Sequence, residues 1–212
     1  MEALTFLIDF STPLVADTSV VINLIATGCA PAIVRALPGR LVVVDTVPAE
    51  LDMGRRRGRD NADRLNELVD AKLVEIVSLG DVAMQHFSAL VIGSAAATLD
   101  DGEAATIAYA VEQAGTAFID ERKATRICAD HYPELRVGCT VDILVHPDMQ
   151  RLLGREALAD GIFNALQAGR MRVFPHHIEQ VIGLIGYERV ASCHSLPRSV
   201  RLSPQTQLTR PF

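Results

Sequence analysis

The chain has 212 residues, a formal net charge of −6, 49% hydrophobic residues, 5% aromatic residues and no Trp. A chain of this length and composition can bury a sizeable core as a globular protein. The negative charge argues against a protein that coats nucleic acid by bulk electrostatics, but it does not exclude nucleic acid as a substrate.

The sequence shows no sign of export or membrane insertion. The N-terminal segment is apolar but lacks a basic stretch, and Glu2 and Asp9 fall where a signal peptide is neutral or positive. No run approaches the roughly 20 apolar residues that a membrane span needs. No metal-ligand spacing relates the cysteines, Cys29, Cys128, Cys139 and Cys193. We therefore expect a cytoplasmic protein with reduced thiols and no membrane association.

The first half of the chain repeats a strand and a helix. Residues 14–17 (LVAD) predict a short strand ending in an acid, and residues 19–26 predict a helix. Residues 41–44 (LVVV) predict a buried strand, and the next helix carries Glu50 near its start. A helix over 60–69, an edge strand over 73–77 and a helix over 81–93 are expected to follow.

The pattern continues through the second half. The segment GEAATIAYAVEQAG predicts an Ala-rich amphipathic helix with Glu103 in its first turn and Gly115 as its stop. Residues 116–119 (TAFI) predict a strand, RKATRICAD a helix, and the residues from Val137 a further strand and helix. Such alternation indicates a parallel sheet covered on both faces. Ligands bind beyond the carboxyl ends of the strands in such sheets.

The last third of the chain is less regular. Residues 155–168 predict a helix that ends at Gly169, and residues 177–185 predict another that ends at Gly186. From Leu196 the chain is rich in Pro, Ser, Thr and Arg, which predicts an extended or disordered tail.

Four acidic residues occupy equivalent places in these repeats. Asp17 and Asp120 end strands, whereas Glu50 and Glu103 open helices that follow strands. All four should therefore lie at one edge of the sheet. A single acid at such a place is more often a helix cap than a ligand, so the coincidence carries the inference. Crowded carboxylates repel unless a cation holds them, and their hard oxygen atoms suit Mg²⁺ or Mn²⁺.

Four segments in order, VADTSVVINL, VVVDTVPAEL, DDGEAATIAYA and FIDERKATRI, resemble the PIN-domain family of metal-dependent ribonucleases. The likeness is to short prokaryotic, VapC-like members, which include the toxins of toxin–antitoxin pairs. It implies a three-layer α/β sandwich with a central, mainly parallel sheet flanked by helices. The nuclease domain would span residues 14–147, followed by a helical extension over 148–195 and a tail over 196–212.

The resemblance also implies roles for the acids. Asp17, Glu103 and Asp120 would bind one or two Mg²⁺ or Mn²⁺ ions, and Glu50 would be a ligand or the base for the attacking water. Glu121 would be a weaker ligand, since many family members carry the shorter Asp at its position. A hydroxyl group that orients the acids would come from Thr18 or Ser19.

Cations beside this edge are candidates for contacts with a phosphate backbone. A solvated helix end is an equally good interpretation of the arginine run, and these cations could instead receive an acidic antitoxin segment. The candidates are Arg55, Arg56, Arg57, Arg122 and Lys123.

The expected function is a Mg²⁺- or Mn²⁺-dependent endoribonuclease with an RNA substrate, a homodimer by family likeness, with an antitoxin partner if it is a toxin. One alternative is a PIN-like module that binds RNA or a partner without cleavage. A phosphoacceptor or phosphatase is a further alternative, but Asp17-Thr18-Ser19 lacks the DxD pair that such sites need. The histidines, including His176 and His177, lack the spacing of a zinc site.

Overall fold

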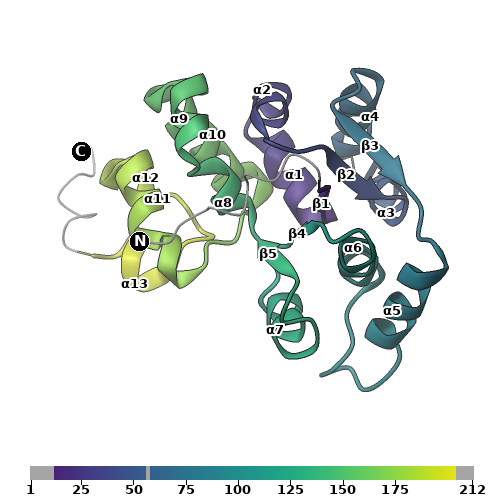
Figure 1. Cartoon of the computed structure of the whole chain (residues 1–212). Helices are drawn as coiled ribbons and strands as arrows, with labels where there is room; N and C mark the ends of the chain where they lie inside the picture. The colour runs from purple at the N-terminus through teal and green to yellow at the C-terminus, as the bar shows by residue number, and fades with distance from the viewer. Residues whose placement is uncertain (1–11, 56–57, 204–212) are drawn as a thin grey trace. The chain divides into compact units, whose positions relative to one another are not determined.

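A computed structural model describes residues 12–55 and 58–203 of the chain (Figure 1). Contacts divide the chain into two compact units. The first joins the residues up to Val21 with Leu37–Cys139, and the second joins Ile22–Ala36 with the residues from Thr140 onward. The sheet and all four predicted acids belong to the first unit.

A five-stranded sheet forms the centre of the first unit, in the order β3-β2-β1-β4-β5. Every pairing between neighbouring strands is parallel, as predicted. The central strands β1, β2 and β4 are buried along their length, whereas β3 lies at an edge and is half exposed, also as predicted. The strands are β1 (Leu14–Ala16), β2 (Leu41–Val44), β3 (Val74–Val77), β4 (Thr116–Phe118) and β5 (Arg136–Gly138).

Helices flank this sheet, which gives the predicted three-layer α/β architecture. One core cluster joins Val15, Val42 and Ala117 of the strands to residues of α5, α6 and α7, so these helices share a hydrophobic core with the sheet (Figure 1). The helices that lie within this unit are α3 (Thr46–Arg55), α4 (Asn61–Asp70), α5 (Asp81–Val91), α6 (Asp101–Glu112) and α7 (Arg122–His131).

Helix α6 differs from its sequence prediction. It packs against β1, β2 and β4 and also against α5. Every residue from Gly102 to Ala110 is buried, so the helix is enclosed rather than amphipathic. Small alanine side chains let α6 approach the strands closely, and this packing fixes where Glu103, at its buried end, can lie.

The end of α6 also differs in detail. The residue with a left-handed backbone is Ala114 (φ 50°), and the N–H of Gly115 donates to the Ala110 carbonyl at 2.8 Å. Gly115 is needed for a different reason: a Cβ atom there would lie 2.6 Å from the carbonyl oxygen of Pro13. The glycine therefore lets the chain entering β4 pass close to the chain entering β1.

The second unit is helical. It contains the later turns of α1 (Thr18–Ala26), followed by α2 (Ala30–Ala36). The predicted helix over 155–168 is regular as α10 (Arg155–Asn164), continues as a π-helical turn (Ala165–Gly169), and stops at the left-handed Arg170 (φ 56°). The remaining segments are α8 (Thr140–Leu144), α9 (Pro147–Leu153), a 3₁₀ turn (Pro175–His177), α11 (Ile178–Ile185), α12 (Tyr187–Val190) and α13 (Arg198–Arg201).

Part of the segment predicted as an extended tail is therefore helical, at α13, and residues 204–212 lie outside the described part of the chain. Among the described residues, no single helix is long and apolar enough to cross a membrane, and only α1 and α2 together, bent by 117°, satisfy length and composition.

We predict that Gly115→Ala destabilises the protein. The added methyl group would overlap the Pro13 carbonyl, and such overpacking typically costs about 1–3 kcal/mol. Urea unfolding followed by circular dichroism measures the change. Gly183→Ala in α11 is the matched control, because a Cβ atom there meets nothing within 4 Å and alanine favours a helix. Equal stability of the two variants would contradict the proposed reason for Gly115.

Candidate metal centre

Asp17 lies where β1 ends and α1 begins. Its backbone N–H donates to the Phe118 carbonyl at 3.1 Å, which extends the pairing of β1 with β4 by one residue. Its carbonyl accepts the N–H of Val21 at 3.0 Å, so Asp17 is also the cap of α1. The strand pairing and the helix start thus fix this carboxylate at the carboxyl edge of the sheet.

The Asp17 carboxylate is buried, with the residue only 5% exposed. The Ser19 hydroxyl donates to its Oδ2 at 2.7 Å, and the backbone N–H groups of Thr18 and Ser19 also donate to the carboxylate. Burial nevertheless raises the pKa of Asp17 from 3.8 to about 6, with a smaller contribution from the negative charge of Asp100. The three hydrogen bonds to the Asp17 carboxylate therefore do not compensate fully for its loss of hydration.

Glu50 enters the cluster from α3. Its Oε2 accepts the Thr18 hydroxyl at 2.6 Å, and its carboxylate also accepts the backbone N–H of Gly102 at the start of α6. Burial, and then the charges of Asp100 and Asp101, raise the pKa of Glu50. Both predicted hydroxyl groups thus orient acids, Thr18 for Glu50 and Ser19 for Asp17.

Glu103 lies in the first turn of α6 and is 8% exposed. The Asp100 side chain accepts its N–H at 2.9 Å, while the Glu103 carboxylate accepts the N–H of Asp100, which completes a capping box. Burial, followed by the charges of Asp100, Asp17 and Glu121, raises the pKa of Glu103 from 4.5 to about 8. The capping box thus holds Glu103 among other acids.

Asp120 and Glu121 follow β4 at the same edge. Asp120 is buried at 4% exposure, two residues beyond the end of the strand. Glu121 precedes the first residue of α7, and its charge acts on Glu103. Two further acids, Asp100 and Asp101, belong to this cluster, although neither is among the predicted ligands. The signal that could have revealed Asp100 is its position three residues before Glu103, which is the spacing of a capping box.

The chemistry of these donors fits a hard divalent cation. The cluster presents carboxylate oxygen atoms, and the pKa values of Asp17, Glu50 and Glu103 are raised because the charged groups are buried together. A bound cation would remove both the repulsion and the desolvation penalty. Oxygen donors of this kind match Mg²⁺ or Mn²⁺.

The model of a family described as PIN domain matches residues 13–187. The chain belongs to the PIN-domain family. The match extends past residue 147, where the predicted nuclease domain ends, into the helical part of the chain. Comparison with curated proteins and with solved structures finds no match.

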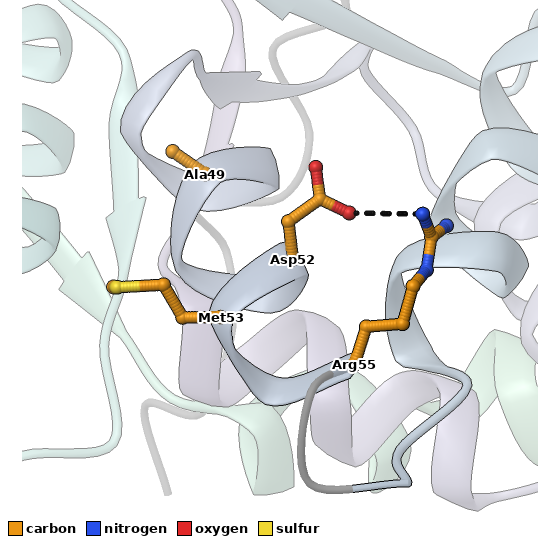
Figure 2. A pocket seen from close by; sticks show the side chains of 4 residues that line it. All are labelled: Ala49, Asp52, Met53 and Arg55. Atoms are coloured by element: carbon orange, nitrogen blue, oxygen red, sulfur yellow. Dashed lines mark ion pairs between the residues drawn. The ribbon is translucent and has the colours of Figure 1, made fainter.

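The predicted substrate cations of this PIN domain have different surroundings. Arg55 pairs with Asp52 at 3.4 Å and also with Asp63 of α4. Arg55, Asp52, Ala49 and Met53 line a pocket of about 410 Å³ on α3. Figure 2 shows these four side chains and the ion pair between Asp52 and Arg55. Neighbouring acids thus balance the charge of Arg55. Arg56 and Arg57 lie outside the described residues.

The cations beside Asp120 lie on α7. The Lys123 ammonium group donates to the Ala95 carbonyl at 2.6 Å, and Arg126 donates to the Ala96 carbonyl at 3.4 Å. These bonds tie the segment between α5 and α6 to α7. Arg122 is exposed next to Glu121, whereas Lys123 is half-buried.

Two residues of the second unit form a pair that the sequence did not reveal. His177 Nε2 lies 2.9 Å from Asp142 Oδ1, and the His176 ring packs against His177 at 4.1 Å between centroids. Burial and the neighbouring His177 lower the pKa of His176.

We predict that the metal-free protein loses stability as pH rises from about 4 to 8. In this range folded Asp17 and Glu103 keep protons that the unfolded chain releases near 3.8 and 4.5, so deprotonation disfavours the folded state. A change of 1 kcal/mol shifts the melting temperature of a chain this size by about 2–4 °C, so a fall of several degrees is expected in EDTA. Mn²⁺ should restore more stability at pH 8 than at pH 5, since protonated carboxylates bind metal poorly.

Asp17→Asn and Glu103→Gln should flatten this pH dependence. Asn still caps a helix and Gln still completes a capping box, so each variant removes the titrating charge and keeps the local structure. Glu67→Gln, at an exposed position on α4, is the control and should behave as the wild type. An unchanged slope in the two site variants would show that other groups cause the pH dependence.

We also predict that Thr18→Val weakens Mn²⁺ binding by about 10–100-fold, the usual effect of losing a group that orients a metal ligand. The variant loses the hydroxyl that donates to Glu50. Thr18→Ser retains a hydroxyl and should bind Mn²⁺ nearly as well as the wild type. Isothermal titration calorimetry measures both, and equal affinities for the Val and Ser variants would exclude this orienting role.

Proposed function

We propose that this PIN domain is a Mg²⁺- or Mn²⁺-dependent ribonuclease that hydrolyses phosphodiester bonds. PIN domains are generally nucleases, so a nuclease is the expected class. The observation that carries the proposal is the burial of Asp17 and Glu103 at one edge of the sheet, which raises the pKa of both carboxyl groups; the charge of Asp17 raises the pKa of Glu103 further. Keeping such acids close together is unfavourable unless a cation binds between them.

The acids have different roles in this proposal. Asp17, Glu103 and Asp120 hold the metal directly or through water, and Glu121 is a weaker ligand. A bound divalent ion supplies an activated water and offsets the charge that develops on the phosphate oxygen atoms. Glu50 is a ligand or the base that accepts a proton from the attacking water. Its two fixed donors, the Thr18 hydroxyl and the Gly102 N–H, support a role that needs a defined orientation.

The proposed substrate is RNA. Arg122 is the first candidate for a phosphate contact, because it is exposed beside Glu121, whereas Arg55 is already paired with acids. Arg56, Arg57 and Lys123 stay candidates from the sequence. Backbone contacts of this kind carry no base specificity, so the proposal names the polymer and not a sequence.

A module that binds RNA without cleaving it is the second candidate. The first is favoured because all four acids are present and three of them have donors that fix their side chains: Asp17, Glu50 and Glu103. A phosphoacceptor is disfavoured because Asp17-Thr18-Ser19 lacks a DxD pair. A toxin role with an antitoxin partner, a homodimer and a cytoplasmic location are further proposals, which rest on the resemblance and the sequence.

We predict that Asp17→Asn and Asp120→Asn each lower RNA cleavage by at least about 100-fold, since each removes a charge from the site. The assay incubates purified protein with a structured RNA and Mn²⁺, with EDTA and a single-stranded DNA as parallel arms. Asp130→Asn, exposed on α7, is the matched control and should cleave as the wild type does.

Equal cleavage by the wild type and both site variants would show that the activity does not come from these acids. RNA binding without cleavage by the wild type, in the presence of Mn²⁺, would instead favour the binding module. Cleavage of DNA in preference to RNA would retain the nuclease and replace the substrate. Growth arrest on expression of the wild type but not of Asp17→Asn would support the toxin role.

A further inference from the structure

The N-terminus of α6 holds three acids through its backbone N–H groups. The N–H of Glu103 donates a hydrogen bond to the Asp100 carboxylate, and the N–H of Asp100 donates one to the Glu103 carboxylate. The N–H of Gly102 donates to Glu50, which comes from a different helix. The positive end of a helix dipole favours such carboxylates.

The Glu50 carboxylate leaves no room for a side chain at Gly102. A Cβ atom at this position would lie 2.5 Å from Glu50 Oε1 and 3.1 Å from both Cδ and Oε2. Real Cβ atoms do not approach an oxygen atom at 2.5 Å, so any larger residue must displace the carboxylate. Moving the Glu50 carboxylate away would break the hydrogen bond that the Thr18 hydroxyl donates to its Oε2 at 2.6 Å and the one that the Gly102 N–H donates.

The backbone of Gly102 does not itself require glycine. Gly102 is part of a regular helix and is absent from the glycines with positive φ among the described residues. Alanine is the better helix former. The close approach of Glu50 is therefore the structural reason for glycine at this position.

We propose that Gly102 is a positioning residue: its missing side chain lets the N-terminus of α6 bind the Glu50 carboxylate and fix it within the acidic cluster. The effect on metal binding rests on the function proposed above, whereas the contact itself does not. Because Glu50 is held between α1 and α6, its place relative to Asp17 and Glu103 depends on both helices.

The contact is tested by a double-mutant cycle in EDTA, using urea unfolding of Gly102→Ala, Glu50→Ala and the double variant. Gly102→Ala should lower the unfolding midpoint in the wild-type background, where Glu50 blocks the methyl group. In the Glu50→Ala background the same change should leave the midpoint unchanged or raise it. Gly183→Ala should behave alike in both backgrounds. An equal loss from Gly102→Ala in both would overturn the contact.

The positioning role is tested by Mn²⁺ affinity, from calorimetry and from the electron paramagnetic resonance of bound Mn²⁺. Gly102→Ala should weaken binding about tenfold or more, and Gly183→Ala should not. If Asp17→Asn loses Mn²⁺ while Gly102→Ala retains wild-type affinity, the positioning role is wrong and the nuclease proposal stands. If the wild type binds no Mn²⁺, the metal-dependent function fails, and the positioning role fails with it.

Discussion

Repulsion among buried carboxylates is the constraint that the rest of this site must satisfy. Asp17 and Glu103 come from segments far apart in sequence, yet burial and the charge of a shared neighbour, Asp100, raise the pKa of both, and the charge of Asp17 also raises the pKa of Glu103. Such an arrangement lowers stability at neutral pH when no cation is bound. Packing elsewhere in the fold must therefore offset the repulsion between these carboxylates. The extensive burial of β1, β4 and α6 provides this packing.

The same side chains that repel one another also start helices. Asp17 caps α1 and Glu103 completes the capping box of α6, so each has a structural partner as well as a place in the cluster. Capping by these acids stabilises the helix ends and at the same time fixes the direction of each carboxylate. A structural and a metal-binding interpretation of an acid at a helix start are therefore compatible, and only variants that keep the cap and remove the charge can separate them.

The sequence predicts the sheet well, because short apolar runs such as LVVV are typical of buried strands and because strands that alternate with helices typically pair in parallel. It predicts the place of the acids at one edge of the sheet, because the carboxyl ends of parallel strands meet there. It does not predict that α6 is enclosed, since alanine suits buried and exposed faces alike. Nor does it predict the contact between Glu50 and Gly102, which are 52 positions apart, or the grouping of residues 22–36 with the C-terminal helices.

Substrate contacts are harder to infer than ligands, because closeness in sequence does not place side chains on one face. Arg55 follows Glu50 by five positions, which turns it about 140° around an α-helix. It accordingly meets Asp63 of α4 rather than the acidic cluster. Arg122 differs because it adjoins Glu121 shortly after β4, so the strand fixes where its backbone lies. A cation that closely follows a strand end therefore has its backbone at this edge, whereas membership of a basic run fixes no such position.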